Sequence, residues 1–412
     1  MPRSDEVGWL VPFSSLTPEQ QGAALMPTDG HRAIVGGPGS GKTLVLLHRF
    51  AYLFQRNGAK ADACRMFVFT TTLKDFIRAA LPDAGVPDDL VTTFDKWCVD
   101  VYKAHISARL PRKTVGKLNL PDFAAIRTGV HEAVTQRGLL RHSYEFVVVD
   151  EGQDLTTQAV EIVGSVAKHV TVAMDGKQQL YDEGAAEDGI LKALGLKRQN
   201  VSLVVGFRCN PMVTALAAHF LPTARQQDEF KLQARNASGD RQRPLLLIAP
   251  EWQTEKERIA ELMRMRFAQG ESVGVLLPRR NLVFGYAKGF KELGIDVVTD
   301  GRNGVEFGDP RPKILTYHEA KGLTFDSIFL PRLDTGAFTE HLLKRQMPLM
   351  FVGVSRATRW VCLSTLEGRM IAPLQDIVSE AGQAYVEIQQ ISGSTAAGNV
   401  DDDHESEEEL PY

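Results

Sequence analysis

The residues best suited to chemistry stand in one glycine-rich run, Gly36-Gly-Pro-Gly-Ser-Gly-Lys42-Thr43. This run follows the apolar residues Ala33–Val35 and precedes a helical pattern, which is the context in which phosphate-binding loops occur. Glycines allow main-chain N–H groups to turn toward a phosphate, and the start of the next helix adds a positive partial charge. We expect Lys42 to contact the β- and γ-phosphates of a nucleoside triphosphate and Thr43 to ligate Mg²⁺.

Two carboxylates, Asp150 and Glu151, end an apolar run that begins at Phe146. A carboxylate at the end of a parallel strand lies at the sheet edge where ligands bind. We expect Asp150 to hold Mg²⁺ and Glu151 to orient and activate the attacking water. Such a pair also occurs at solvated strand ends, but its place downstream of a complete phosphate loop favours the catalytic interpretation.

The elements that must position these residues alternate between strand-like and helix-like patterns. Short apolar or β-branched runs are typical of buried parallel strands, and amphipathic stretches such as Lys42–Gln55 and Thr254–Ala268 separate them. This alternation predicts βαβ units and parallel sheets. The strand-like runs form a first series and a second: Ala33–Gly36, Arg65–Thr70, Phe146–Asp150 and Val170–Met174, then Leu245–Ala249, Ser272–Leu277, Asp296–Val298, Lys313–Thr316, Ser327–Leu330 and Trp360–Ser364.

Composition favours an ordinary globular protein of two or three domains, since 43% of the 412 residues are hydrophobic and 24% are charged. No apolar run is long enough to span a membrane, and the N-terminus lacks an export signal. The 4 cysteines are far apart, which indicates reduced core residues rather than a metal site or disulfides. We therefore expect a cytoplasmic protein that does not contact a membrane.

Charge is unevenly distributed along the chain. The formal net charge is −4, and removing the seven carboxylates of the last twelve residues brings it to +3. That mild positive balance neither supports nor excludes a nucleic-acid partner. Residues 392–412 hold small and then acidic residues, so we expect a disordered acidic tail.

The segment Asp150-Glu-Gly-Gln-Asp154 resembles the DExQD box of UvrD/Rep-type superfamily 1 helicases. Further segments resemble the motifs of this family, in the family's order along the chain. They are Leu16–Gln20 (Q motif), Thr70–Lys74 (motif Ia), Thr92–Phe94 (motif Ib), Met174–Tyr181 (motif III), Gly206–Arg208 (motif IV), Thr316–Phe325 (motif V) and Val352–Ala357 (motif VI).

The resemblance implies an α/β fold with two RecA-like P-loop domains in tandem and ATP with Mg²⁺ between them. We expect a first domain over residues 1–200 and a second over 201–391, since the join falls near residues 195–205, although the polar stretch Arg225–Arg243 is a competing candidate. The resemblance adds a small helical insertion at about 100–144 in the first domain. It also implies that Gln20 recognises adenine, Gln178 senses the γ-phosphate, and Arg208 and Arg356 reach across to it. The expected nucleotide-binding set is Gln20, Gly36, Gly39, Ser40, Gly41, Lys42, Thr43 and Gly322.

The strand-binding motifs depart from the family's pattern. The family commonly has an aromatic residue where Thr71 stands, a histidine at Asp95 and Gly-Trp-Arg at residues 182–184, which here are Asp-Glu-Gly. Base stacking is worth roughly 1–3 kcal/mol, so these losses weaken the predicted track. Phe94, Trp97 or Tyr181 either replace the missing platforms or belong to the core.

The resemblance makes Lys74 and His318 candidate strand contacts. The short connection before motif V leaves no room for the large second accessory domain of the family, which suggests a minimal motor. The preferred function is an ATP-dependent 3′–5′ translocase or helicase on single-stranded DNA, in DNA repair or phage defence, with a nuclease or repair factor as partner. The alternative is an ATP-dependent switch that controls such a partner without processive unwinding.

Overall fold

The computed structural model describes residues 11–115, 118–175, 187–197, 200–203, 210–233, 241–299, 309–379 and 384–391. Several predictions concern residues outside this part of the chain. They are the roles of Gln178, Tyr181 and Arg208, the replacement at residues 182–184, and the acidic tail over residues 392–412.

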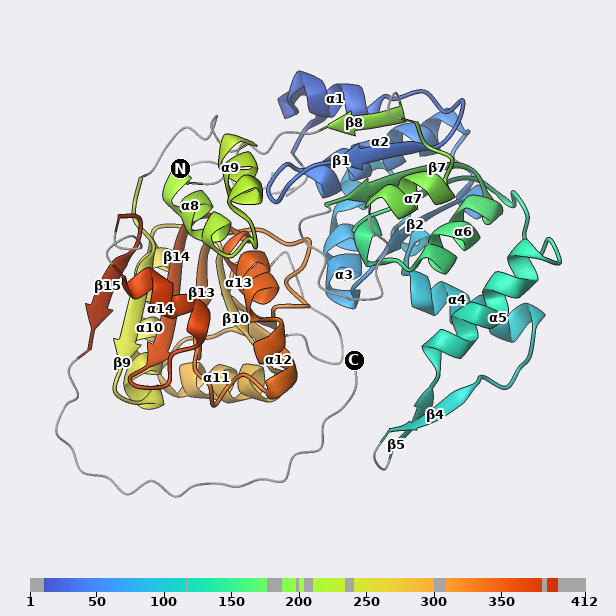
Figure 1. Ribbon diagram of the computed structural model, residues 1–412. Coiled ribbons are helices and arrows are strands. Elements are labelled where there is room, and N and C mark those ends of the chain that lie inside the picture. Colours follow the sequence, from blue (N-terminus) through green and yellow to red (C-terminus); the bar gives the residue numbers. More distant parts are fainter. Residues whose placement is uncertain are drawn as a thin grey trace.

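The first sheet has six parallel strands in the order β3-β2-β6-β7-β1-β8 (Figure 1). These are β1 (Arg32–Val35), β2 (Cys64–Val68), β3 (Val91–Thr93), β6 (Tyr144–Val149), β7 (Ala167–Met174) and β8 (Val201–Leu203). The helices of this half are α1 (Pro18–Ala24), α2 (Lys42–Arg56), α3 (Thr71–Ala80), α4 (Phe94–His105), α5 (Phe123–Thr135), α6 (Thr157–Val166) and α7 (Glu187–Ala193).

The second sheet has seven parallel strands in the order β11-β12-β10-β13-β14-β9-β15. These are β9 (Leu245–Ala249), β10 (Val273–Leu277), β11 (Val298–Thr299), β12 (Lys313–Thr316), β13 (Phe325–Leu330), β14 (Ala357–Leu366) and β15 (Glu387–Gln390). The helices of this half are α8 (Pro211–His219), α9 (Ala224–Gln233), α10 (Trp252–Ala268), α11 (Arg280–Glu292), α12 (Glu340–Lys344), α13 (Gln346–Val354) and α14 (Ala372–Val378).

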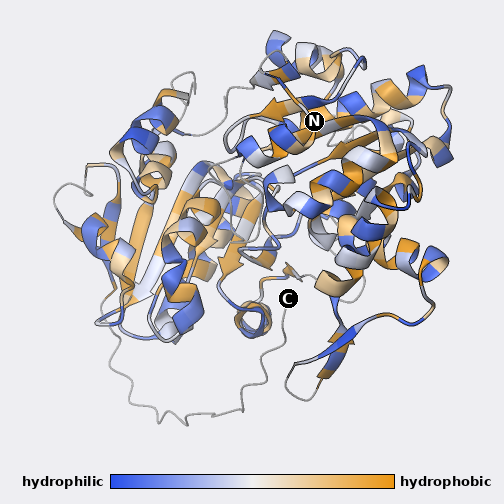
Figure 2. Ribbon diagram, turned by 45° about the vertical axis from the view of Figure 1, so that its right-hand side comes forward, coloured by the Kyte–Doolittle hydropathy of each residue, from blue (hydrophilic) through white to orange (hydrophobic). Residues whose placement is uncertain are grey.

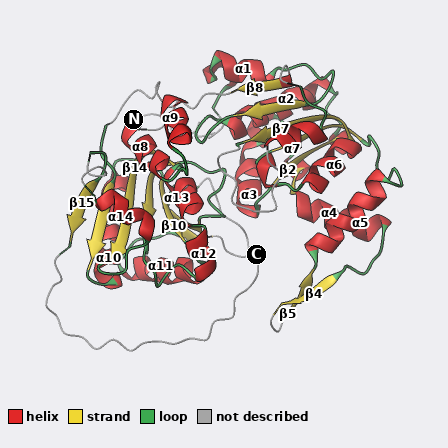
Figure 3. Cartoon of the chain, viewed as in Figure 1, coloured by secondary structure: helices red, strands yellow, loops and turns green. Residues whose placement is uncertain are grey.

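Both sheets are covered by helices on their two faces (Figure 3), which explains why their strands are almost continuously apolar. In β9, Leu245 and Leu247 pack into the core that α10 and α11 cover. The alternate residues Leu246 and Ile248 pack into the opposite core, which contains Val352 of α13. Figure 2 shows the hydrophobic strands between helices of mixed polarity. The predicted α/β class with two parallel sheets is therefore confirmed.

The segment between α4 and α5 forms an antiparallel hairpin of β4 (Arg112–Val115) and β5 (Leu118–Pro121). In Figure 1 this hairpin projects away from both sheets. The insertion predicted as helical over about 100–144 thus contains a hairpin as well as α5. Prolines at both ends account for the difference, since a proline lacks the N–H that a helix interior requires.

The two sheets divide the chain slightly later than predicted. Strand β8 pairs with β1, so Val201–Leu203 belongs to the first sheet although the expected division fell at residue 200. The domain limits themselves stay predictions. No helix among the described residues is long and apolar enough to cross a membrane.

A buried guanidinium ties the phosphate-loop helix to the sheet behind it. The Arg49 side chain of α2 is 0% exposed, and its Nε donates to the Thr171 hydroxyl of β7 at 2.6 Å. Its Nη1 donates to the carbonyls of Ala24 and Met26, and its Nη2 lies 2.9 Å from Nε2 of His169. These hydrogen bonds satisfy a charge that would otherwise be costly to bury, and they tie α2 to β7 and to the end of α1.

Candidate nucleotide site

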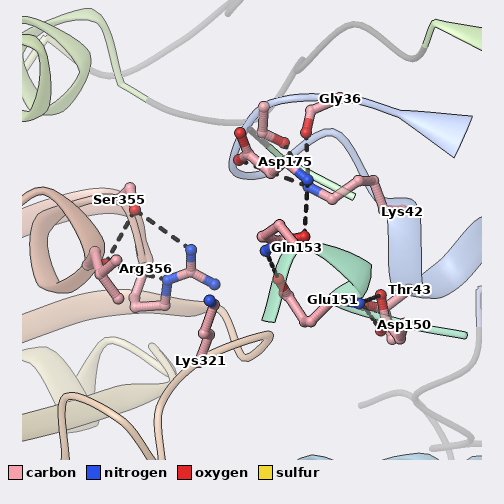
Figure 4. Close-up of polar contacts among 12 residues, drawn as sticks. Gly36, Lys42, Thr43, Asp150, Glu151, Gln153, Asp175, Lys321, Ser355 and Arg356 are labelled. Atoms are coloured by element: carbon pink, nitrogen blue, oxygen red, sulfur yellow. Dashed lines mark hydrogen bonds and ion pairs between the residues drawn. The ribbon is translucent and has the colours of Figure 1, made fainter. Parts of the chain in front are cut away.

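The glycine-rich loop connects β1 to α2 with a tight backbone. Gly39 and Gly41 have φ values of 71° and 79°, in the left-handed region that glycine adopts without strain. Lys42 is the first residue of α2, and its ammonium donates to the carbonyls of Gly36 at 2.8 Å and Gly37 at 3.1 Å (Figure 4). The loop therefore holds its lysine against its own main chain, at the positive end of a helix.

Thr43 and Asp150 meet at the end of β6. The Thr43 hydroxyl donates to Oδ2 of Asp150 at 2.6 Å, and both are oxygen groups of the kind that Mg²⁺ prefers. Burial and the neighbouring Glu151 raise the pKa of Asp150 to about 7, while the Thr43 hydrogen bond and Lys42 lower it. A divalent cation at this carboxylate would offset the cost of burial. The predicted metal pair is thus brought together.

Ser40 and Gln20 complete the loop. The buried Ser40 hydroxyl makes no hydrogen bond within the described residues, while the Ser40 carbonyl accepts from Nε2 of Gln20 at 2.9 Å. Oε1 of Gln20 accepts from the N–H of Thr17 at 3.0 Å, which caps α1. A free hydroxyl, two left-handed glycines and a fixed amide fit a phosphate and a base, so the residues present suit a nucleotide.

Glu151 is positioned by an unusual backbone and by Gln153. It is a non-glycine residue with φ 52°, a conformation that occurs at functional sites when the surroundings enforce it. Nε2 of Gln153 donates to Oε2 of Glu151, and Oε1 of Gln153 accepts from the N–H of Asp175 at 3.0 Å. The carboxylate is therefore oriented by a neighbouring side chain that is itself held in place.

Cations from both halves of the chain act on Glu151. Burial alone would raise its pKa, but Lys321, Lys42 and Arg356 lower it by more, so its net shift is downward. Lys321 and Arg356 belong to the second half, and Figure 4 shows both side chains on the side of Glu151 and Gln153. The Glu151 carboxylate is thus influenced by cations from both halves of the chain.

A buried ion pair joins the two halves beside this site. Nζ of Lys321 lies 2.6 Å from a carboxylate oxygen of Asp154, and the two side chains are 1% and 0% exposed. Arg356 is also buried, and it donates from Nε to the Val352 carbonyl at 3.2 Å and from Nη1 to the Leu323 carbonyl at 3.3 Å. Motif V therefore contacts the DExQD segment, and Arg356 of motif VI is held against motif V.

Gly322 lies where the second half of the chain approaches α3 of the first half. Its φ is 82°, and a Cβ there would come within 2.9 Å of Leu73 Cδ1 in α3. The glycine therefore allows the turn after β12 to approach α3 closely. Its nucleotide-binding role stays a prediction, as do the catalytic roles assigned from the motifs.

The expected strand contacts are engaged within the protein. Lys74 lies 3.2 Å from the Asp75 carboxylate. Burial lowers the pKa of His318 to about 4, with smaller contributions from Lys321, Arg345 and His341. This ring is therefore neutral at neutral pH. Phe94 and Trp97 pack with Phe67 in a buried core of the first half of the chain.

Sequence reasoning assigned no role to Gln153, Asp154, Asp175 or Lys321, although all four stand in the quoted motifs. Asp175 lies 3.8 Å from Nζ of Lys42, and Gln153 links its main chain to Glu151. Their presence in the motifs was the signal that could have singled them out. Which groups each of them contacts could not be predicted, because those contacts depend on the fold.

The fold has two parallel α/β sheets, and the glycine-rich loop after β1 has a lining that suits a nucleotide. Residues 16–122 match the model of the UvrD/REP helicase N-terminal domain. The ATP-dependent DNA helicase PcrA of Bacillus subtilis is 30% identical over 122 residues, which are 29% of this chain and 16% of PcrA. A probable DNA helicase of Mycoplasma pneumoniae is 21% identical over 442 residues, covering 84% of this chain and 82% of that protein.

Among solved structures, the C-terminal domain of a possible DNA helicase from Lactobacillus plantarum matches with a TM-score of 0.35 and 16% identity. This match covers 44% of the present chain and 98% of that domain. The chain is therefore similar in sequence to UvrD/Rep-type DNA helicases, most clearly over residues 16–122.

Proposed function

We propose that the chain is an ATP-dependent motor on single-stranded DNA. The observation that carries this proposal is the convergence on Glu151 of Lys42 from the phosphate loop with Lys321 and Arg356 from the second half. When residues of two sheets form one hydrolytic site, a relative movement of the sheets changes the electrostatic interactions within that site. It can therefore couple hydrolysis to a conformational step.

The residues have distinct tasks in this proposal. Lys42 and the loop N–H groups bind the phosphates of ATP, and Gln20 contacts the adenine. Thr43 and Asp150 hold Mg²⁺, which would neutralise charge on the phosphates. Glu151 orients the attacking water and accepts its proton, and Arg356 stabilises the negative charge that develops during phosphoryl transfer. By family resemblance we add Gln178 and Arg208 to this set.

The wider setting is also part of the proposal. We infer 3′–5′ polarity, a cytoplasmic location, a role in DNA repair or phage defence, and a nuclease or repair factor as partner. Each of these rests on resemblance to the family. The proposed minimal architecture rests on the short connection between β11 and β12.

A second candidate function is an ATP-dependent switch that regulates a protein partner. The two residues expected to contact a strand support this second candidate, since Lys74 is paired with Asp75 and the His318 ring is neutral. In this case ATP binding would move the two sheets without driving the chain along a strand.

Steady-state ATP hydrolysis, with and without single-stranded DNA at low and moderate salt, tests both candidates. Strong, salt-sensitive stimulation is expected of the motor, because the strand binds through its phosphates. Hydrolysis that DNA leaves unchanged would favour the switch. Lys42→Ala should abolish hydrolysis, and Glu151→Gln should bind ATP but hydrolyse it far more slowly, whichever candidate holds.

A further inference from the structure

A cavity of about 370 Å³ lies in the second half of the chain, between α10 and α11. Trp252 and Lys256 of α10 form one wall, and Asn281 and Lys288 of α11 form another. Arg332, which follows β13, also lines it. None of these residues takes part in the nucleotide site.

The cavity begins at the carboxyl edge of the second sheet and continues along α11 as far as Glu292. Helix α10 begins just after β9, α11 begins just after β10, and Arg332 comes two residues after β13 ends at Leu330. All three strands run parallel within one sheet. Ligands of α/β proteins bind outside this edge, so the position suits a binding site.

The lining combines an aromatic plane with cations and an amide. Trp252 is 48% exposed, and the Lys256 ammonium lies 4.4 Å from the centre of its ring. The charged lining residues are the cations Lys256, Lys288 and Arg332 and the single carboxylate of Glu292. An indole can stack on a nucleobase, an amide can bond to its edge and lysines can contact its phosphate, so this lining suits a nucleotide.

The walls are held rigidly from behind. Glu255 is 0% exposed and accepts from the Tyr286 hydroxyl at 2.6 Å, the Ser364 hydroxyl at 2.6 Å and the N–H of Arg332 at 3.0 Å. Arg332 has φ 60° and pairs with Asp334. A site whose walls are fixed before binding loses less entropy when a ligand enters.

We propose that this cavity binds one nucleotide of a single strand, with its base stacked on Trp252 and its phosphate beside Lys288. The inference rests on the proposed motor function and names a strand contact in the second half. It would supply the base stacking that Thr71 and residues 182–184 do not provide in the first half. A strand is favoured over a free nucleotide because Trp252, Asn281 and Lys288 are all exposed, so the cavity is open at its rim.

Binding of labelled oligothymidylate to the full chain at low salt tests this inference. Trp252→Ala should weaken binding about tenfold or more, because stacking one base is worth roughly 1–3 kcal/mol. Trp252→Phe should retain most of the affinity, and Lys288→Gln should reduce its salt dependence. Phe284→Ala is the matched control, since Phe284 is 52% exposed on α11 but lies outside the lining, and it should bind like the wild type.

The outcomes separate this inference from the proposed function. If Trp252→Ala binds like the wild type while DNA still stimulates hydrolysis, the cavity assignment is wrong and the motor stands. If free thymidine monophosphate displaces the labelled oligonucleotide from the wild type at the nucleotide concentrations where unlabelled oligothymidylate does, the cavity takes free nucleotides and the strand assignment is wrong. If the wild type hydrolyses ATP but binds no oligonucleotide, both the motor and the strand assignment fail.

Discussion

At the scale of single residues, Gln20 shows how a side chain can be fixed and still be available. Its oxygen accepts from Thr17 and its nitrogen donates to Ser40. A carboxamide has two acceptor sites and two donor hydrogens, so one of each remains. That remaining pair matches the donor and acceptor that adenine presents at N6 and N7, whereas guanine presents two acceptors there.

Gln20→Ala should therefore reduce the preference for ATP over GTP, measured as the ratio of the two kcat/KM values. It also removes one of the two hydrogen bonds of the α1 capping box, while the Thr17 hydroxyl still caps the helix. Gln20→Glu is the matched control, because a carboxylate keeps the acceptor for Thr17 but has no hydrogen to donate. If Gln20→Glu discriminates as well as the wild type, Gln20 does not recognise the base.

His169 makes the stability of the first half depend on pH. Its Nδ1 lies 2.7 Å from the Gly30 carbonyl and its Nε2 lies 2.9 Å from Arg49, so the ring is neutral and donates through Nδ1. Burial, Arg49, His31 and Arg32 lower its pKa from 6.5 to about 3, against the Gly30 hydrogen bond. Below pH 6.5 the unfolded chain takes up a proton that the folded chain does not.

The free energy of unfolding should therefore fall as pH falls below 6.5, by up to about 1.4 kcal/mol per pH unit for this residue. Urea unfolding at several pH values measures the slope. His169→Gln keeps one donor and one acceptor but does not titrate, so its slope should be shallower. Burial also lowers the pKa of His31, so His31 should still contribute to the slope in this variant. An unchanged slope in His169→Gln would contradict this account.

At the scale of elements, the packing of α5 beside α4 determines the charge around Asp95. Asp95 lies in the first turn of α4, and Arg127 of α5 donates to its carboxylate at 2.8 Å. The sequence shows only that a carboxylate stands where the family commonly has a histidine. Because α5 places a guanidinium beside it, the local charge is close to balanced.

Arg127→Gln should therefore weaken binding of single-stranded DNA several-fold at low salt, because it leaves the Asp95 charge unbalanced, with the effect shrinking as salt rises. Asp95→Asn should act in the opposite direction. Both side chains are partly exposed, so stability should change by less than about 1 kcal/mol. If binding is identical in all three proteins, α4 lies away from the strand.

Elements differ in how far the sequence predicts them. The phosphate loop and the end of β6 were predictable, because a strand, a glycine run and a helix start are local patterns that specify their own geometry. The interior position of Phe94 and Trp97 was not, since an aromatic residue near a motif suits a core and a base equally well. The β4–β5 hairpin was hidden because its period-2 pattern covers only a few residues.

At the scale of the whole molecule, the Asp154–Lys321 pair links the two sheets. A buried charge that loses its partner is costly, whereas replacing both charges by apolar groups is often neutral. Neither partner had an assigned role before the fold was known, because they are far apart in sequence and no local pattern connects them. This contact is therefore the part of the site that sequence reasoning could not supply.

Lys321→Met should lower the free energy of unfolding by about 3–5 kcal/mol, because Asp154 stays buried without its cation. The double variant Lys321→Met with Asp154→Leu should recover most of that loss. Chemical unfolding measures stability, and hydrolysis with and without DNA measures coupling between the halves. If the double variant is as stable as the wild type but DNA no longer stimulates it, the pair transmits the strand signal.

The order of strands in the first sheet has a consequence for the integrity of the chain. Strands β1, β2 and β3 precede the projecting hairpin and β6, β7 and β8 follow it, yet β6 and β7 lie between β2 and β1. A protease that cut the hairpin would produce two pieces whose strands alternate within one hydrogen-bonded sheet. A nicked molecule should therefore remain assembled, and two separately expressed fragments divided at the hairpin should reconstitute it.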